Sequence, residues 1–287
     1  MSGCSVRNYA LDQAADALAN QGTGFASDDD PELIRDAAPF SLKLIDSLIA
    51  QRPRHGALLL AATRAYTQYA YAFVQQDADR LEDSNVAEAY RLRQRAAGFY
   101  RRARDYGLKA LGNDDPEYIN QLRTKPGNRL DHLGAESVPL LYWTGAAWAG
   151  WIALSKDNGD AIADWPVVQA LLDRASTLDA AYGNGALQGL LINVEMARGG
   201  DPAKATAQAR SRFDRAVQWS GGKLAAPYVT LAEAVAVPNQ DRAEFNRLLA
   251  SALAIDPDGL PEARLENRIM QNRGRWLQAH ADKFFME

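Results

Sequence analysis

The sequence has few of the residues that build disulfides and metal sites. Its 287 residues include a single cysteine, Cys4, and three histidines, His55, His132 and His280. One cysteine cannot form an internal disulfide, and histidines scattered so widely lack the spacing of metal ligands. We therefore expect no disulfide, no metal site and no other cofactor.

Catalytic signatures are missing as well. The sequence contains no G-x-S-x-G elbow, no phosphate-binding G-x-x-x-x-G-K-[ST] loop, no complete G-x-G-x-x-G and no H-E-x-x-H. The acidic stretch "SDDDPE" lacks the alternating oxygen ligands and the glycine of an EF-hand loop, and it fits a helix start with Asp30 as N-cap and Pro31 first. We expect no catalytic residue and no enzyme activity. The alternative is an enzyme whose catalytic carboxylates belong to no recognised motif.

No excess of positive charge marks the chain as a whole. The formal net charge is -4 and the pI is near 5.5, so no global field attracts nucleic acid. One basic run with interleaved aromatics, "RLRQRAAGFYRRARDYGLK", begins at Arg91 and could suggest a nucleic-acid patch. An acidic series lies just before it, so neutralisation between adjacent antiparallel helices is the favoured interpretation. That series is Asp77, Asp79, Glu82, Asp83 and Glu88.

Sustained alternation of period two is also absent, which argues against strands. Apolar residues instead recur at three and four positions from about residue 8 onward, and 47% hydrophobic content supplies a sizeable core. Breakers such as "RPRHG", "KDNGD", "RGGDP" and "VPNQD" leave room for one or two helices between them. The pattern predicts an all-α protein.

A degenerate repeat appears when helix-like segments are aligned on one alanine. Each segment carries a bulky residue, an alanine three positions later and a helix end shortly beyond. The aligned positions, Ala103, Ala175, Ala216 and Ala252, are 72, 41 and 36 residues apart, and 72 is two units of 36. This is close to the tetratricopeptide period, so we expect a right-handed helical-hairpin solenoid of degenerate tetratricopeptide-like repeats.

Residues 137–155 carry no charge and include three tryptophans. The run contains a proline and central rather than terminal tryptophans, which argues against a membrane span. An enclosed helix is expected instead, with Trp148 in structural packing. Trp143 and Trp151 flank the small Ala147 on one face of the helix. Two large rings on either side of a small side chain leave a gap, so we expect this face to form the wall of an apolar cavity. The alternative is that all these rings interdigitate as core.

Other parts of the chain supply candidates for the opposite wall of this expected cavity and for its polar group. Tyr69 and Phe73 share a helical face and are the candidates for the opposite wall. Glu195 and Glu233 interrupt apolar helices, and a buried carboxylate must either pair with a group such as arginine or line a polar cavity. We select Glu195 as the group that orients a ligand head in a mostly apolar pocket.

The amino terminus has the end of a lipobox but no hydrophobic stretch before it. Cys4 lies in "SGCS", so it is either an acylated residue of a lipoprotein or an incidental thiol. We divide the chain into a tether with the start of the first helix, residues 1–24, and one solenoid domain, residues 25–287.

Several long segments together resemble the T-component family of TRAP transporters, the TatT-type tetratricopeptide-like lipoproteins. The most distinctive are "FASDDDPELIRDAAPFSLKLIDSLI", "YTQYAYAFVQQDADRLED", "LYWTGAAWAGWIALSKDN" and "RLENRIMQNRGRWL". The resemblance runs from about Tyr9 to Phe285. It covers nearly the whole chain, although none of the segments is a catalytic signature.

The resemblance implies a periplasmic lipoprotein anchored through Cys4, with the membrane touched only by the lipid. It also implies an internal channel for an apolar ligand, association with the solute-binding P subunit, and a possible homotrimer. The expected function is a non-enzymatic accessory to solute import that binds a small hydrophobic or organic-acid ligand and no nucleic acid. The alternative is an interaction scaffold with a packed interior and no small-molecule ligand.

Overall fold

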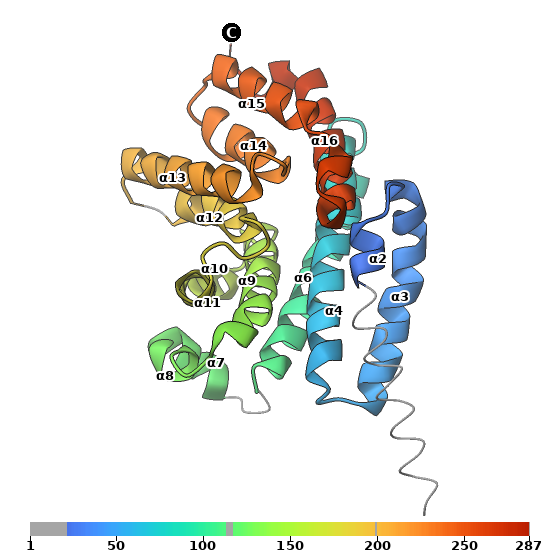
Figure 1. Cartoon of the computed structure of the whole chain (residues 1–287), viewed down its shortest axis with the longest axis vertical. Helices are drawn as coiled ribbons and strands as arrows, with labels where there is room; N and C mark the ends of the chain where they lie inside the picture. Colours follow the sequence, from blue (N-terminus) through green and yellow to red (C-terminus); the bar gives the residue numbers. More distant parts are fainter. Residues whose placement is uncertain (1–21, 113–116, 199, 287) are drawn as a thin grey trace, which may run out of the picture. The chain divides into compact units, whose positions relative to one another are not determined.

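The computed structural model describes residues 22–112, 117–198 and 200–286, and every regular element in these ranges is helical (Figure 1). The all-α prediction is therefore confirmed. In chain order the α-helices are α2 (Gly22–Ala26), α3 (Pro31–Gln51), α4 (Gly56–Tyr69), α5 (Gln76–Leu81), α6 (Val86–Ala110), α7 (Glu117–Thr124), α8 (Gly127–Leu130), α9 (Val138–Ala153), α10 (Gly159–Ala163), α11 (Trp165–Leu178), α12 (Ala186–Ala197), α13 (Pro202–Ser220), α14 (Ala226–Leu231), α15 (Arg242–Ala254) and α16 (Arg264–Ala279).

Shorter turns of other helix types complete the element order. Two of them, η1 (Ala70–Gln75) and η3 (Ala232–Ala236), are π-helical and continue α4 and α14 without a break. The remaining four are single 3₁₀ turns: η2 (Ala135–Ser137), η4 (Pro257–Gly259), η5 (Pro261–Ala263) and η6 (Ala281–Lys283).

Several helices begin at a capping residue that the sequence supplies. Helix α3 starts at Pro31, as the "SDDDPE" stretch predicts. The side chains of Asn85, Asp201 and Asp241 accept hydrogen bonds from backbone N–H groups in the first turns of α6, α13 and α15. Since the first N–H groups of a helix have no partner within it, each cap replaces hydrogen bonds that water would otherwise supply.

Backbone proximity divides the chain into two compact units. Among the described residues, the first comprises 22–25 and 32–174, and the second comprises 26–31 and the residues from Ala175 onward. The prediction of a single solenoid domain over residues 25–287 stays a prediction.

In the first unit, α6 packs against both the α4–η1–α5 segment and α9, and α4 also contacts α9. Glycines allow the α6–α9 contact to be close. A methyl group on Gly150 of α9 would meet the Tyr100 ring at 2.7 Å, and one on Gly107 of α6 would meet Thr144 Oγ1 at 2.2 Å. The two helix backbones therefore approach more closely than larger residues would permit.

We expect Gly107→Ala to lower the free energy of unfolding by roughly 1–3 kcal/mol, as overpacking does. The added methyl would also lie 3.0 Å from both Cβ and Cγ2 of Thr144, so rotating that side chain cannot relieve the contact. Gly98→Ala on the same helix is the matched control. Nothing lies within 4 Å there, so it should gain up to about 1 kcal/mol of helix propensity. Denaturant unfolding measures both, and equal effects at the two glycines would contradict the close contact.

The second unit is built from the α12–α13 pair and from α14, η3, α15 and α16. In this unit the backbone at Gly185, the residue before α12, lies close to the backbone of α13. The φ angle of Gly185 is +92°. A side chain there would come within 2.8 Å of the Ala216 carbonyl oxygen on α13. Glycine therefore meets two requirements, a left-handed backbone and a close backbone contact.

The four aligned alanines are all fully buried. Ala103, Ala175, Ala216 and Ala252 lie on α6, α11, α13 and α15, and each has no exposed surface. The bulky residues three positions before them include Tyr100, Leu172 and Leu249, which are also buried. The alignment thus identified buried positions at which a small side chain follows a large one by three residues.

Helix α9 contains most of the tryptophan-rich run. It has 16 residues, and its buried positions all fall on one half of the helix, whereas the opposite half is only partly buried. Of the helices that the structure describes, none has the length and apolar content needed to span a bilayer.

Candidate functional site

A π-helical turn brings the first pair of predicted site residues together. Tyr69 ends α4 and Phe73 lies within η1, where i to i+5 hydrogen bonding widens the helix locally. The two ring centroids are 5.7 Å apart. Turns of this kind are rare and frequently occur at functional sites, so η1 marks the candidate site in the first unit.

Aromatic rings from α4, η1 and α6 form one cluster around this turn. Phe99 of α6 lies 5.8 Å from the Tyr69 ring and 5.7 Å from the Tyr66 ring, measured between centroids. Tyr66, Tyr69 and Phe73 are buried, whereas Phe99 is half-buried. We call Tyr66, Tyr69, Phe73 and Phe99 the aromatic cluster. Tilted and edge-on ring pairs at these distances are favourable beyond the area that they bury.

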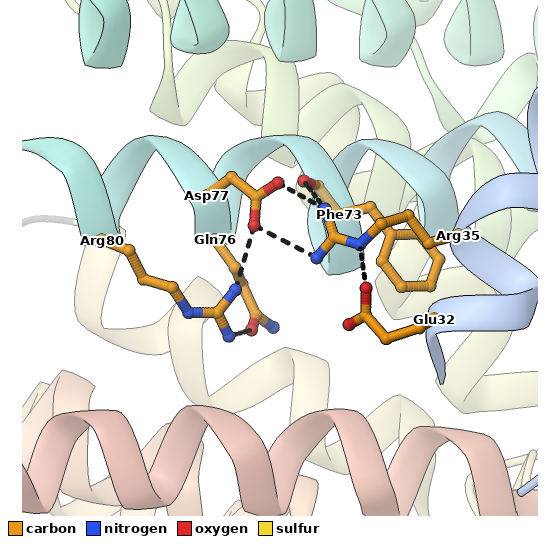
Figure 2. A network of polar contacts seen from close by, with 6 residues as sticks. All are labelled: Glu32, Arg35, Phe73, Gln76, Asp77 and Arg80. Atoms are coloured by element: carbon orange, nitrogen blue, oxygen red, sulfur yellow. Dashed lines mark hydrogen bonds and ion pairs between the residues drawn. The ribbon is translucent and has the colours of Figure 1, made fainter. Parts of the chain in front are cut away.

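A guanidinium group lies against one ring of the aromatic cluster. Arg35 of α3 places its Cζ 5.0 Å from the Phe73 centroid and forms a two-pronged ion pair with Asp77 of α5 (Figure 2). Its Nε is also 3.2 Å from Glu32. The hydrogen bond to Asp77 raises the pKa of Arg35 above its usual value, so the cation on Phe73 is permanent.

Asp77 also pairs with a second arginine, Arg80, which donates a hydrogen bond to the buried side-chain amide of Gln76. Arg80 donates to Asp77 at 3.0 Å and to Gln76 Oε1 at 3.2 Å, as Figure 2 shows. Gln76 is buried, and in the described part of the chain its Nε2 group donates no hydrogen bond. A buried donor without an acceptor is costly, roughly 1–3 kcal/mol. The site therefore combines apolar rings, two guanidinium groups and one available N–H donor.

A second polar network fixes the outer edge of the aromatic cluster. Asp46 of α3 accepts hydrogen bonds from Tyr66 at 2.8 Å and from Tyr106 of α6 at 2.7 Å. Burial, together with the hydrogen bond to Asp46, raises the pKa of Tyr66 to about 12. Burial alone would raise the pKa of Asp46, but hydrogen bonds from Lys43 and the two tyrosines outweigh it and lower that pKa. One carboxylate thus ties α3, α4 and α6 together.

The structure gives the three tryptophans of α9 different surroundings. Trp148 is fully buried and donates from Nε1 to Asp164 at 3.2 Å. Trp151 is half-buried, with the Arg104 guanidinium carbon 4.3 Å from its ring centroid. Trp143 is half-buried and meets Tyr142 edge-on at 4.9 Å.

No ring contact within the described residues joins Trp143 or Trp151 to Tyr69 or Phe73. Tyr69 and Phe73 are brought together, but a cavity shared by all four rings stays a prediction.

Glu195 lies in the second unit and is held there by arginine. It is 1% exposed, and its Oε1 accepts hydrogen bonds from Arg212 at 2.9 and 3.1 Å. Its other carboxylate oxygen is 3.3 Å from Arg198. The expectation that this acid pairs with an arginine is confirmed, and its role toward a ligand stays a prediction.

Glu233 lies within the second π-helical turn, η3. It accepts from Arg273 at 2.6 Å, and Arg273 lies 4.7 Å above the Trp276 ring. Each π turn is therefore accompanied by an acid, an arginine and an aromatic ring, with Asp77, Arg35 and Phe73 at the first. The expected arginine partner is confirmed for Glu233 as well.

Sequence reasoning did not select Arg35, Gln76 and Asp46, which are central to the geometry. "YTQYAYAFVQQDAD" carried part of the signal, since Gln76 and Asp77 follow Phe73 directly. Nothing in the sequence pairs Arg35 with Asp77, 42 residues later. Cys4 lies outside the described residues, so its predicted acylation stays a prediction.

Comparison with known proteins places the chain in one family. An uncharacterized protein of Treponema pallidum (strain Nichols) is 29% identical over 307 aligned residues, covering 100% of this chain and 94% of that protein. The family model of the TRAP transporter T-component matches residues 27–285. The chain therefore belongs to the TRAP transporter T-component family, whose members are accessory transporter subunits and not a known class of enzyme.

Proposed function

We propose that this protein is the periplasmic T component of a TRAP uptake system and that it binds both a small amphiphilic ligand and the solute-binding P subunit. Membership of the family supplies the accessory role. The observation that carries the ligand is the aromatic cluster at η1, with the Arg35 cation on Phe73 and, three residues further along the chain, a buried Gln76 amide that donates no hydrogen bond among the described residues.

The ligand class follows from the chemistry of this site. Rings such as Tyr69 and Phe73 favour an apolar body, and a guanidinium or amide donor favours an anionic head. A small hydrophobic organic acid satisfies both requirements. In our proposal such an acid binds at η1 and its carboxylate accepts the Gln76 N–H.

The remaining parts of the proposal concern architecture and placement. We propose a right-handed solenoid of tetratricopeptide-like hairpins, supported by the fully buried alanines at near-repeat spacing. Acylation of Cys4 in the precursor tethers it to the membrane. A homotrimer is proposed from the family resemblance alone.

The second candidate function is an interaction scaffold without a small-molecule ligand. The burial of Tyr69 and Phe73 favours it, because rings covered by their own chain are ordinary core residues. The two candidates differ in whether a ligand can enter the aromatic cluster.

Ligand binding separates these candidates. We expect native mass spectrometry of the purified protein to show a retained small molecule, and added decanoate to change the intrinsic fluorescence. Gln76→Leu should weaken decanoate binding about ten-fold or more, because a hydrogen bond to a charged group contributes roughly 1.5–3 kcal/mol.

Gln218→Leu is the matched control for that experiment. Gln218 is exposed on α13, so its replacement should leave decanoate affinity unchanged. No retained molecule and no response to decanoate would favour the scaffold instead.

A further inference from the structure

One face of α6 is exposed along its length. A series of positions three and four apart on this helix is solvent-exposed. We call this set the outer face of α6: Arg91, Gln94, Arg95, Gly98, Arg101, Arg102 and Asp105. It spans about four turns, or roughly 21 Å.

Positive charge is concentrated on this helix although the chain as a whole is acidic. Between Val86 and Ala110 there are six arginines, one lysine and two acids, whereas the chain carries a net charge of -4. Neutralisation across the hairpin, expected from the sequence, holds for Arg93, which pairs with Glu82 at 2.7 Å. In the part of the chain that the structure describes, Arg95 and Arg101 form no ion pair.

Two guanidinium groups of the outer face are held in place by contacts within the protein, before any partner binds. Arg95 lies over the Phe99 ring, 5.3 Å from its centroid. Arg102 donates to the Tyr66 hydroxyl at 3.0 Å and lies 5.2 Å from the centre of that ring. Since both side chains are already ordered, less conformational entropy is lost when a partner binds them.

The glycine at the middle of the outer face has no role in internal packing. A side chain at Gly98 would meet nothing within 4 Å, in contrast to Gly107, which faces Thr144. Glycine inside a helix is less favourable than alanine, so the fold alone does not account for it. A partner lying across α6 does account for it, because the missing side chain lets another backbone come close.

We propose that the outer face of α6 docks a carboxylate-rich surface of the solute-binding P subunit; this inference rests on the proposed function and names the surface used. Arginine forks match carboxylates in a two-pronged geometry. At the amino end of the helix, Tyr90 is 61% exposed and Val86 71% exposed, which adds an apolar anchor. Tyrosine and arginine together are typical of protein interfaces, so we choose a protein over a lipid surface.

Charge reversal tests the proposal. We expect Arg95→Glu with Arg101→Glu to weaken binding of the purified P subunit about 100-fold or more, because like charges then face each other. Binding is measured by calorimetry in buffer containing a chelator, and the wild-type affinity should fall as salt is added. The matched control is Arg215→Glu with Arg247→Glu, two exposed arginines of the second unit with the same change of charge. It should bind like the wild type.

A second variant separates docking from folding. Gly98→Gln should not lower the melting temperature, because the position is open and glutamine favours helix more than glycine does. It should still weaken P-subunit binding at least ten-fold by holding the partner away. A variant that lost binding only together with its helical circular dichroism signal would count against the proposal.

The binding measurements distinguish failure of the proposed function from failure of the docking inference. If the wild-type protein does not bind the P subunit, the proposed function fails and this inference fails with it. If the wild type binds and both α6 variants bind equally well, the inference alone is overturned. Loss of binding to phosphatidylglycerol vesicles, or of self-association, in the Arg95/Arg101 variant while P-subunit binding persists would overturn it in favour of a lipid surface or a second copy.

Discussion

Replacing Glu195 with alanine is expected to lower the free energy of unfolding by roughly 3–5 kcal/mol, the usual effect of removing one member of a buried ion pair. The carboxylate is 1% exposed and accepts two hydrogen bonds from Arg212, whose side chain is largely buried. Its removal leaves that cation without a counter-charge in a low-dielectric interior. Chemical denaturation followed by circular dichroism measures the loss.

Asp282→Ala is the control for this experiment. Asp282 pairs with Arg242, but its side chain is 88% exposed, so its loss should change stability by less than about 1 kcal/mol. A loss at Glu195 no larger than this would contradict a buried ion pair. Unchanged decanoate affinity in a folded Glu195→Gln variant would argue against the predicted ligand role of Glu195.

Trp148→Ala is expected to produce a loss of similar size, roughly 3–5 kcal/mol. The ring is fully buried in α9, and removing it leaves a cavity that neighbouring helices fill only in part. It also deprives the buried Asp164 of one donor, although Arg123 remains at 2.6 Å. Thermal and denaturant unfolding should agree on the loss.

The neighbouring tryptophans provide the comparison. Trp143 and Trp151 are half-buried, so alanine at either position should destabilise the protein clearly less than at Trp148. If they form the wall of a cavity, each replacement should also alter the fluorescence response to decanoate. A loss as large as at Trp148, with no ligand response, would favour the packed-interior alternative.

Local signals predicted a large part of the fold. The helix start at Pro31 and the buried positions of Ala103 and Ala216 followed from cap residues and from spacing. Such features depend on residues a few positions apart, which is why they can be read along the chain. The arginine partners of Glu195 and Glu233 were also expected as a type, because burial of a charge requires a counter-charge.

The candidate site was predicted only in part. The pattern placed Tyr69 and Phe73 on one helical face, and the structure brings their rings together. It gave no sign that the helix widens into a π turn between them, since the same residues are compatible with an unbroken α-helix. Arg35 was missed because its contact with Asp77 spans 42 residues of sequence.

By itself, the sequence determined that this protein is helical, that α3 begins at Pro31, which aligned alanines are enclosed and, through its long segments, to which family it belongs. The tertiary structure decided which charges meet. Arg93 is neutralised across the hairpin while Arg95 and Arg101 on the same helix are left facing solvent. Helical periodicity fixes the direction of a side chain around its own axis, but the neighbour that it meets depends on how distant helices pack, and that is set by the whole core.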